Sequence, residues 1–172
     1  FYYSKILENS VDDKIFLARI YDRRGACYER SKKWEKAEKD LKKSLDLHPD
    51  QAYVLNYLAY SWLEQNKKID EAYTMLKKAN NLKKNNPYIL DSLGWALHLK
   101  GNYTDAKFYI EEALTYLPSD PIISDHYGDI LWKLGRKMQA NYFWKNVLTF
   151  EDTEEKMKED INYKLIKGPK NS

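Results

Sequence analysis

The chain has 172 residues, of which 43% are hydrophobic and 32% charged, and its formal net charge is +3. That length suits one domain or a short repeat array, and the mixing of acids with bases excludes the basic block that nucleic-acid binders show. The single cysteine, Cys27, excludes an intramolecular disulfide framework, and no apolar run approaches the roughly 18 residues that a membrane span needs.

The first predicted element is a helix followed by a connector, within residues 1–16. Three of its residues lie 34 positions before residues that we place on a later second helix: Tyr3, Leu7 and Ser10. We therefore expect this segment to be the second helix of an upstream repeat unit. Because the first helix of that unit is absent, we expect the chain to be cut from a longer array.

Four predicted helix–turn–helix units follow, over residues 18–51, 52–86, 87–120 and 121–150. A small residue recurs in each first helix, with spacings of 34, 35 and 34 residues: Gly25, Ala59, Gly94 and Gly128. An alanine recurs in each second helix, with spacings of 35, 34 and 34 residues: Ala37, Ala72, Ala106 and Ala140. Apolar residues flank both sets with helical periodicity, and a period of this size indicates a repeat array.

Short polar turns separate the two helices of each unit, and the extra residue of the second unit falls inside such a turn. Gly101 and Gly135 stand where the first helix should end, so we expect left-handed cap residues there. Two antiparallel helices approach closely only where one lacks a side chain. A larger residue at Gly94 or Ala106 is therefore expected to push its helix pair apart.

The last predicted element, residues 151–172, is a charged helix with acids in its first turn, as the helix dipole favours. We expect it to cap the open face of the last unit with four apolar residues: Ile161, Tyr163, Leu165 and Ile166. The final residues, KGPKNS, are predicted to be a disordered tail.

The pattern resembles the tetratricopeptide repeat (TPR) family, whose 34-residue units follow W-x2-L-G-x2-Y…A-x3-F…P. The residues that carry the resemblance are Gly25, Tyr28, Ala37, Leu41 and Pro49; Leu58, Ala59, Trp62, Ala72 and Leu76; Leu93, Gly94, Leu97, Ala106, Ile110 and Pro118; and Tyr127, Gly128, Leu131, Ala140 and Trp144. The resemblance implies an all-α fold: a right-handed α-solenoid of helical hairpins with a C-terminal capping helix. The segments DSLGWAL and DHYGDILWKLGR are similar to sequences in TPR proteins of bacteria, in particular of the alphaproteobacterial type.

In this family the first helices line the concave side of the superhelix. The inward positions lie six and three residues before the small residue and one and four after it. We call them the inner stripe, and the stripe is rich in rings and carboxylates. Its predicted partner-binding residues are Asp22, Tyr53, Asn56, Tyr60, Tyr88, Asp91, Trp95, His98, Asp125, Asp129 and Trp132.

Aromatic residues anchor bound peptides and carboxylates select cations, so we expect a protein or peptide ligand with apolar and basic residues. The alternative is that some of these rings pack between neighbouring units. Some TPR domains grip C-terminal carboxylates with Lys and Asn at these positions. Here only Asn56 fits, and the other places hold mostly Asp and aromatic residues, so binding of an acidic chaperone tail is not expected.

No catalytic or metal-binding pattern is present. The three histidines, His48, His98 and His126, form no i, i+4 pair, and adjacent Asp125 and His126 point in different directions on a helix. We expect no enzyme, metal or cofactor, and we interpret Cys27 as a buried packing thiol.

The function that we predict is a protein-interaction scaffold. The alternatives are a substrate-recruiting region of a larger protein, self-association through Phe1, Tyr2 and Ile6, and a nucleic-acid-binding helical repeat, which the acidic stripe disfavours. The compartment stays open, with a bacterial cell-envelope location favoured over the cytoplasm.

Overall fold

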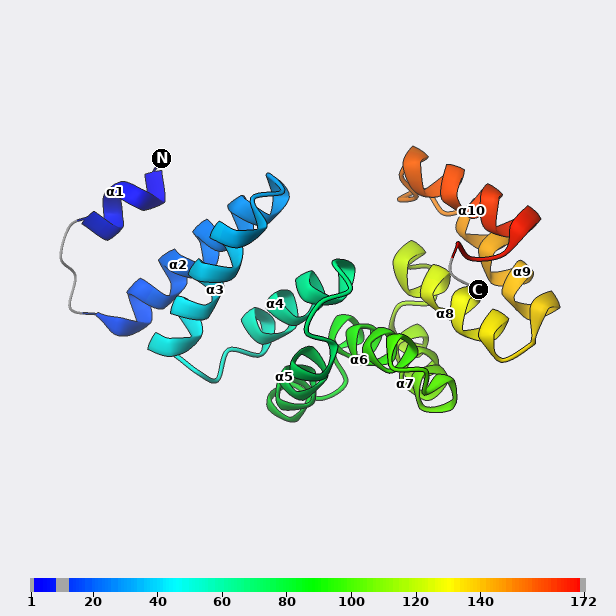
Figure 1. The fold of residues 1–172 in the computed structure, drawn as a ribbon, viewed down its shortest axis with the longest axis horizontal. Helices are drawn as coiled ribbons and strands as arrows, with labels where there is room; N and C mark the ends of the chain where they lie inside the picture. The colour runs from blue at the N-terminus through cyan, green and yellow to red at the C-terminus, as the bar shows by residue number, and fades with distance from the viewer. Residues whose placement is uncertain (1, 9–12, 171–172) are drawn as a thin grey trace. The chain divides into compact units, whose positions relative to one another are not determined.

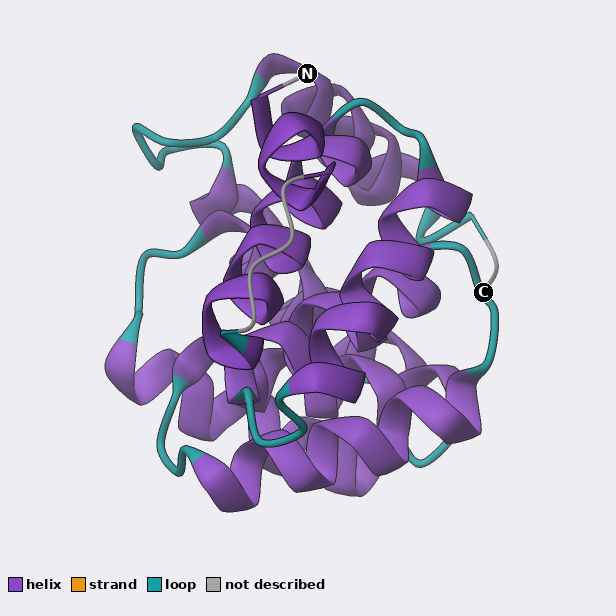
Figure 2. Ribbon diagram, turned by 90° about the vertical axis from the view of Figure 1, so that its left-hand side faces the viewer, coloured by secondary structure: helices purple, strands orange, loops and turns teal. Residues whose placement is uncertain are grey.

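The computed structural model describes residues 2–8 and 13–170, and all regular structure in these residues is helical (Figures 1 and 2). Phe1, Ser10 and the last two residues, with the side chain of Ile6, lie outside the described part, so the self-association expected of Phe1 and Ile6 stays a prediction. The chain forms two compact units, residues 1–84 and 85–172.

The N-terminal unit holds five helices among its described residues: α1 (Tyr2–Glu8), α2 (Lys14–Arg30), α3 (Trp34–Leu47), α4 (Ala52–Glu64) and α5 (Ile69–Leu82). Helices α2 and α3 form one antiparallel hairpin, and α4 and α5 form the next (Figure 1). Helix α1 packs on α2, and α3 packs on α4, so that neighbouring hairpins stack within this unit.

The C-terminal unit, as far as Lys170, also forms five helices: α6 (Pro87–Leu99), α7 (Tyr103–Tyr116), α8 (Pro121–Lys133), α9 (Lys137–Val147) and α10 (Glu155–Lys167). Helices α6 with α7, and α8 with α9, form two hairpins, and α8 contacts both helices of the first. The last helix, α10, packs on α9 and buries Ile161 completely.

The small residues lie at the helix crossings, as the repeat predicts. A Cβ atom added to Gly94 would stand 2.6 Å from Cγ1 of Ile110 and 3.1 Å from the backbone oxygen of Ala106. At Gly128 an added Cβ would overlap the indole ring of Trp144, which is fully buried. In the first, third and fourth hairpins the glycine of the first helix is thus the socket for the large apolar residue four positions after the alanine of the second helix.

Each hairpin turn contains a residue in the left-handed conformation at the same position of the repeat, and the second turn has a further one, Lys68 (φ 48°). Gly101 (φ 80°) and Gly135 (φ 76°) are the two predicted cap residues, and the prediction is confirmed. In the first two hairpins Lys32 (φ 56°) and Asn66 (φ 53°) take this place. The residue after each of the four closes the turn with a backbone hydrogen bond of 2.8–2.9 Å to the carbonyl five positions earlier, as in a Schellman motif.

The first hairpin contains one ion pair that breaks the apolar pattern. Arg24 lies where the other units carry an apolar residue, and its guanidinium binds the buried carboxylate of Asp40 through two hydrogen bonds of 2.6 and 2.7 Å. Such a bidentate pair satisfies both charges inside a helix interface. Arg24 is therefore a substitute for an apolar contact.

Three expectations about side chains need correction. Cys27 is exposed, because its position on α2 faces away from the partner helix α3. In the terminal helix Ile161 is buried and Leu165 half-buried, but Tyr163 and Ile166 are 43% and 78% exposed. The tail is ordered as far as Lys170: Gly168 is buried and Lys170 pairs with Asp160 at 2.7 Å.

Candidate functional site

In the N-terminal unit the inner stripe lines a surface pocket of about 330 Å³. Arg19 and Asp22 of α2 and Tyr53 of α4 form part of its wall, with Ile15 at one side. The loop between α3 and α4 forms another part of the wall. Within this loop the side-chain amide of Gln51 donates a hydrogen bond of 2.7 Å to the carbonyl of His48. The pocket therefore joins apolar, cationic and anionic groups.

Two stripe residues of this pocket differ in exposure. Asp22 is half-buried, and burial raises the pKa of its carboxyl, with Arg23 acting in the opposite direction. The side chain of Tyr53 is 56% exposed, and the ammonium of Lys83 lies 4.1 Å from its ring centroid and donates to its hydroxyl. Tyr53 thus already carries a cation on one face of its ring.

The two remaining predicted residues of this unit, Asn56 and Tyr60, are half-buried on α4. The side-chain oxygen of Asn56 is buried and accepts no hydrogen bond from the described residues. A buried carbonyl oxygen without a donor costs free energy, so this group has capacity for a donor from outside.

In the C-terminal unit the stripe residue Trp95 lies in a stack of three rings. His98, one turn along α6, stacks on it at a centroid distance of 4.6 Å with an interplanar angle of 9°. His126 of α8 stacks on it at 4.2 Å with an angle of 12°. Trp95 is half-buried in this stack, which fixes its orientation.

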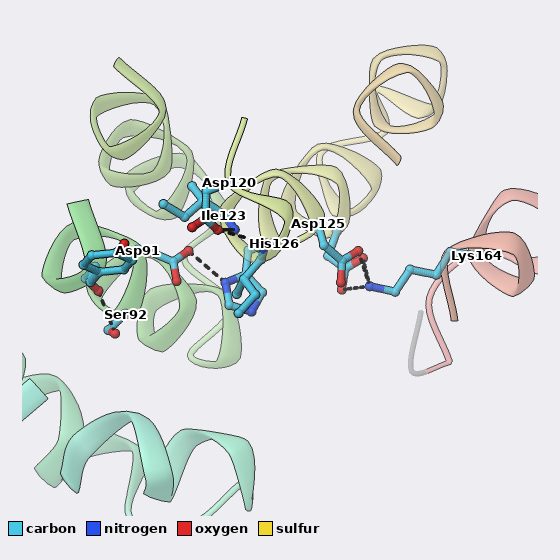
Figure 3. A network of polar contacts seen from close by, with 10 residues as sticks. Asp91, Ser92, Asp120, Ile123, Asp125, His126 and Lys164 are labelled. Carbon is cyan, nitrogen blue, oxygen red and sulfur yellow. Dashed lines mark hydrogen bonds and ion pairs between the residues drawn. The ribbon is translucent and has the colours of Figure 1, made fainter. Parts of the chain in front are cut away.

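Asp91 and His126 form a buried ion pair that joins α6 to α8 (Figure 3). The distance from Nδ1 of His126 to Oδ1 of Asp91 is 2.8 Å, and the two residues are 6% and 5% exposed. Burial acts to lower the pKa of His126, but the carboxylate of Asp91 outweighs it and raises that pKa above its usual value. For His98, burial and the nearby His126 lower the pKa to about 4.

The other two stripe carboxylates bind a lysine of the terminal helix, and Figure 3 shows the contact of this lysine, Lys164, with Asp125. The ammonium of Lys164 lies 2.6 Å from Asp125 and 2.8 Å from Asp129, whose side chains are 15% and 10% exposed. Burial acts to lower the pKa of Lys164, but the two carboxylates raise it above its usual value. Burial raises the pKa of Asp129, and Asp125 raises it further, against the opposing effect of Lys164.

The last two predicted residues of this unit, Tyr88 and Trp132, differ in exposure. Tyr88 is 55% exposed at the start of α6. Trp132 is half-buried, its ring lies against the backbone of Gly168, and Lys137 lies over it at 4.8 Å. Gly168 has φ 79°, and an added Cβ would stand 2.6 Å from the Trp132 ring, so both its backbone angle and this contact require glycine.

Sequence reasoning missed two residues that bind the stripe carboxylates: His126, which pairs with Asp91, and Lys164, which pairs with Asp125 and Asp129. Asp125 and Asp129 lie four residues apart on one helix face, and two such carboxylates favour a cation between them. That signal predicts a basic partner, but it does not say that the chain supplies its own. His126 lies off the stripe in sequence, and only the packing of α8 against α6 brings it to Asp91.

Within the described residues no group of three or more His, Cys, Asp and Glu side chains is arranged to hold a metal ion. No described helix has both the length and the apolar character of a membrane span.

Family models of the tetratricopeptide repeat match residues 18–51 and 88–120. The chain belongs to the tetratricopeptide repeat family. The two matches cover the first and third units, where the sequence pattern also predicts TPR hairpins. TPR proteins are in general protein-interaction scaffolds, and this coarse function extends to the chain.

Solved structures of TPR type resemble this chain. PilW, described as a widely conserved type IV pilus biogenesis factor, has a TM-score of 0.79 and 17% identity over 96% of this chain and 74% of its own. MamA of AMB-1 has a TM-score of 0.64 and 22% identity over 92% and 88%. PilF of Pseudomonas aeruginosa has a TM-score of 0.66 and 20% identity over 81% of this chain, which spans only 64% of the PilF structure.

At these identities the likeness shows the TPR fold alone. No curated protein matches the chain.

Proposed function

We propose that this TPR chain is a scaffold whose inner stripe binds a protein segment carrying apolar and basic side chains. The observation that supports this most directly is the exposure of Tyr53 and Tyr88, at 56% and 55%, at the start of first helices. Large rings left in water at such positions are suited to anchor a peptide at low entropic cost.

The pairing of Lys164 with two stripe carboxylates supports the basic part of the proposed ligand. Asp125 and Asp129 hold an ammonium group at 2.6 and 2.8 Å, which is the contact that a partner's lysine would make with a carboxylate of the stripe. In the N-terminal unit Asp22 lines the pocket beside Tyr53. We expect Asp22 to select a basic residue and Tyr53 to pack on the apolar residue next to it.

The experiment is a peptide selection against the purified chain, followed by binding measurements on variants. Selected peptides should be rich in Lys or Arg next to aromatic or aliphatic residues. Tyr53→Ala and Tyr88→Ala should each weaken the binding of the peptides that contact their own unit by about tenfold or more, the range of an aromatic hot spot.

The matched control is Phe108→Ala, which removes a ring that is 63% exposed on the second helix α7, off the stripe. This change should leave affinity unchanged. Peptides that lose affinity with Phe108→Ala and keep it with both tyrosine variants would remove the inner stripe from the proposal. A cell-envelope location of this scaffold stays part of the proposal, and a fractionation experiment with the natural host would test it.

A further inference from the structure

We propose that the hairpin turns of the N-terminal unit form a second binding site, for an acidic peptide segment of a partner protein. The structure has a surface pocket of about 460 Å³ at the turns between α2 and α3 and between α4 and α5. Four lysines line it, Lys32, Lys33, Lys36 and Lys67, together with Trp34. None of them belongs to the inner stripe, so this site is separate from the one proposed above.

The charges around this pocket leave it positive. Of its two acidic residues, Glu38 is already paired, with Lys42 at 2.7 Å and Lys68 at 2.6 Å. Burial acts to raise the pKa of Glu38, but hydrogen bonds from these two lysines lower it to about 2, so that it stays a compensated carboxylate. This leaves Glu35 as the second acidic residue of the lining, against four lysines, so the lining carries a net positive charge.

Lys32 combines a place in the pocket lining with a left-handed backbone. Lys32 has φ 56° at the turn position where the third and fourth hairpins carry Gly101 and Gly135. Glycine adopts this conformation without steric cost, whereas a lysine is strained there. The second hairpin carries the uncharged Asn66 at this position, so what distinguishes Lys32 is its ammonium group in the pocket lining.

The form of the pocket favours an acidic peptide over other anions. It is a hollow with an indole in its wall, which suits a carboxylate side chain next to an apolar one, whereas a membrane surface is flat. Glu35 in the lining repels a long polyanion such as nucleic acid more strongly than a short acidic peptide.

The test uses the full chain and a fluorescein-labelled, end-capped hexaglutamate peptide, with binding followed by fluorescence anisotropy at low salt. The pocket variant is Lys32→Gly with Lys36→Gln, and we expect it to weaken hexaglutamate binding about tenfold. The charge-matched control is Lys39→Gln with Lys43→Gln, which removes two exposed lysines from the same helix outside the pocket. We expect this control to change affinity less than twofold.

A second comparison separates the binding role of Lys32 from a structural role. Lys32→Gly and Asn66→Gly each replace a left-handed residue with glycine at the same turn position, so both should raise the midpoint of thermal unfolding. Only Lys32→Gly removes a lining charge, and only it should weaken hexaglutamate binding. A loss of stability with Lys32→Gly would contradict the argument from backbone strain.

Several results would overturn the proposal. These are equal losses of affinity in the pocket variant and the charge-matched control, no binding of hexaglutamate, or tighter binding of pyrophosphate, phosphatidylglycerol vesicles or single-stranded RNA than of hexaglutamate. Because Tyr53→Ala and Tyr88→Ala leave this pocket intact, they should not change hexaglutamate affinity, so the failure of one proposal is distinguishable from the failure of the other.

Discussion

Replacing Gly94 with alanine should destabilise the C-terminal unit, although alanine is the better helix former. In an exposed helix interior the change would stabilise the fold by about 1 kcal/mol. Here the new Cβ would lie 2.6 and 2.7 Å from two side-chain carbons of Ile110 and 3.1 Å from a backbone oxygen. Ile110 is fully buried, so it cannot turn toward solvent to relieve the contact. Overpacking of this kind costs up to about 3 kcal/mol, which leaves a net loss of about 2 kcal/mol.

The assay is thermal unfolding followed by circular dichroism, and a loss of about 2 kcal/mol lowers the midpoint by about 4–8 °C in a chain of this size. The second hairpin supplies a control, because Ala59 and Leu76 stand at the repeat positions of Gly94 and Ile110 and both are buried. Gly94→Ala combined with Ile110→Leu reproduces that pair and should recover part of the stability. A midpoint for Gly94→Ala equal to or above that of the unchanged protein would refute the steric account of the crossing points.

Three further changes test the candidate site and the surface. Lys164→Met should cost about 3 kcal/mol of unfolding free energy in urea titrations, because it leaves Asp125 and Asp129 part-buried without a cation; an unchanged midpoint would mean that the pair is not needed. His98 stays neutral in the folded chain down to a pKa of about 4 but takes up a proton near pH 6.5 when unfolded, so its contribution to stability is lost as the pH falls below 6.5. Between pH 7 and 5 the unchanged protein should therefore lose up to about 2 kcal/mol relative to His98→Gln, and equal losses in urea titrations of both would contradict the burial of this imidazole. The exposed thiol of Cys27 should react with Ellman's reagent in the folded chain, and reaction only after unfolding would contradict its exposure.

The candidate site was predictable in part. The stripe positions follow from counting residues from Gly94 and Gly128, and this counting finds Asp91, Trp95 and Asp125. It cannot find His126 or Lys164, because their places depend on contacts between helices 35 to 39 residues apart.

Spacing in the sequence by itself determined the repeat, the hairpins and the sockets at their crossings. The physical reason is that helix periodicity and the need for small residues at close contacts are local or recur at a set interval. The left-handed turn residues at Gly101 and Gly135 follow in the same way. Only the tertiary structure decided which charges are neutralised, because a carboxylate's partner is chosen by packing, as Asp129 with Lys164 illustrates. It also decided the exposure of Cys27 and the burial of Gly168 against Trp132, since these depend on how helices rotate and dock.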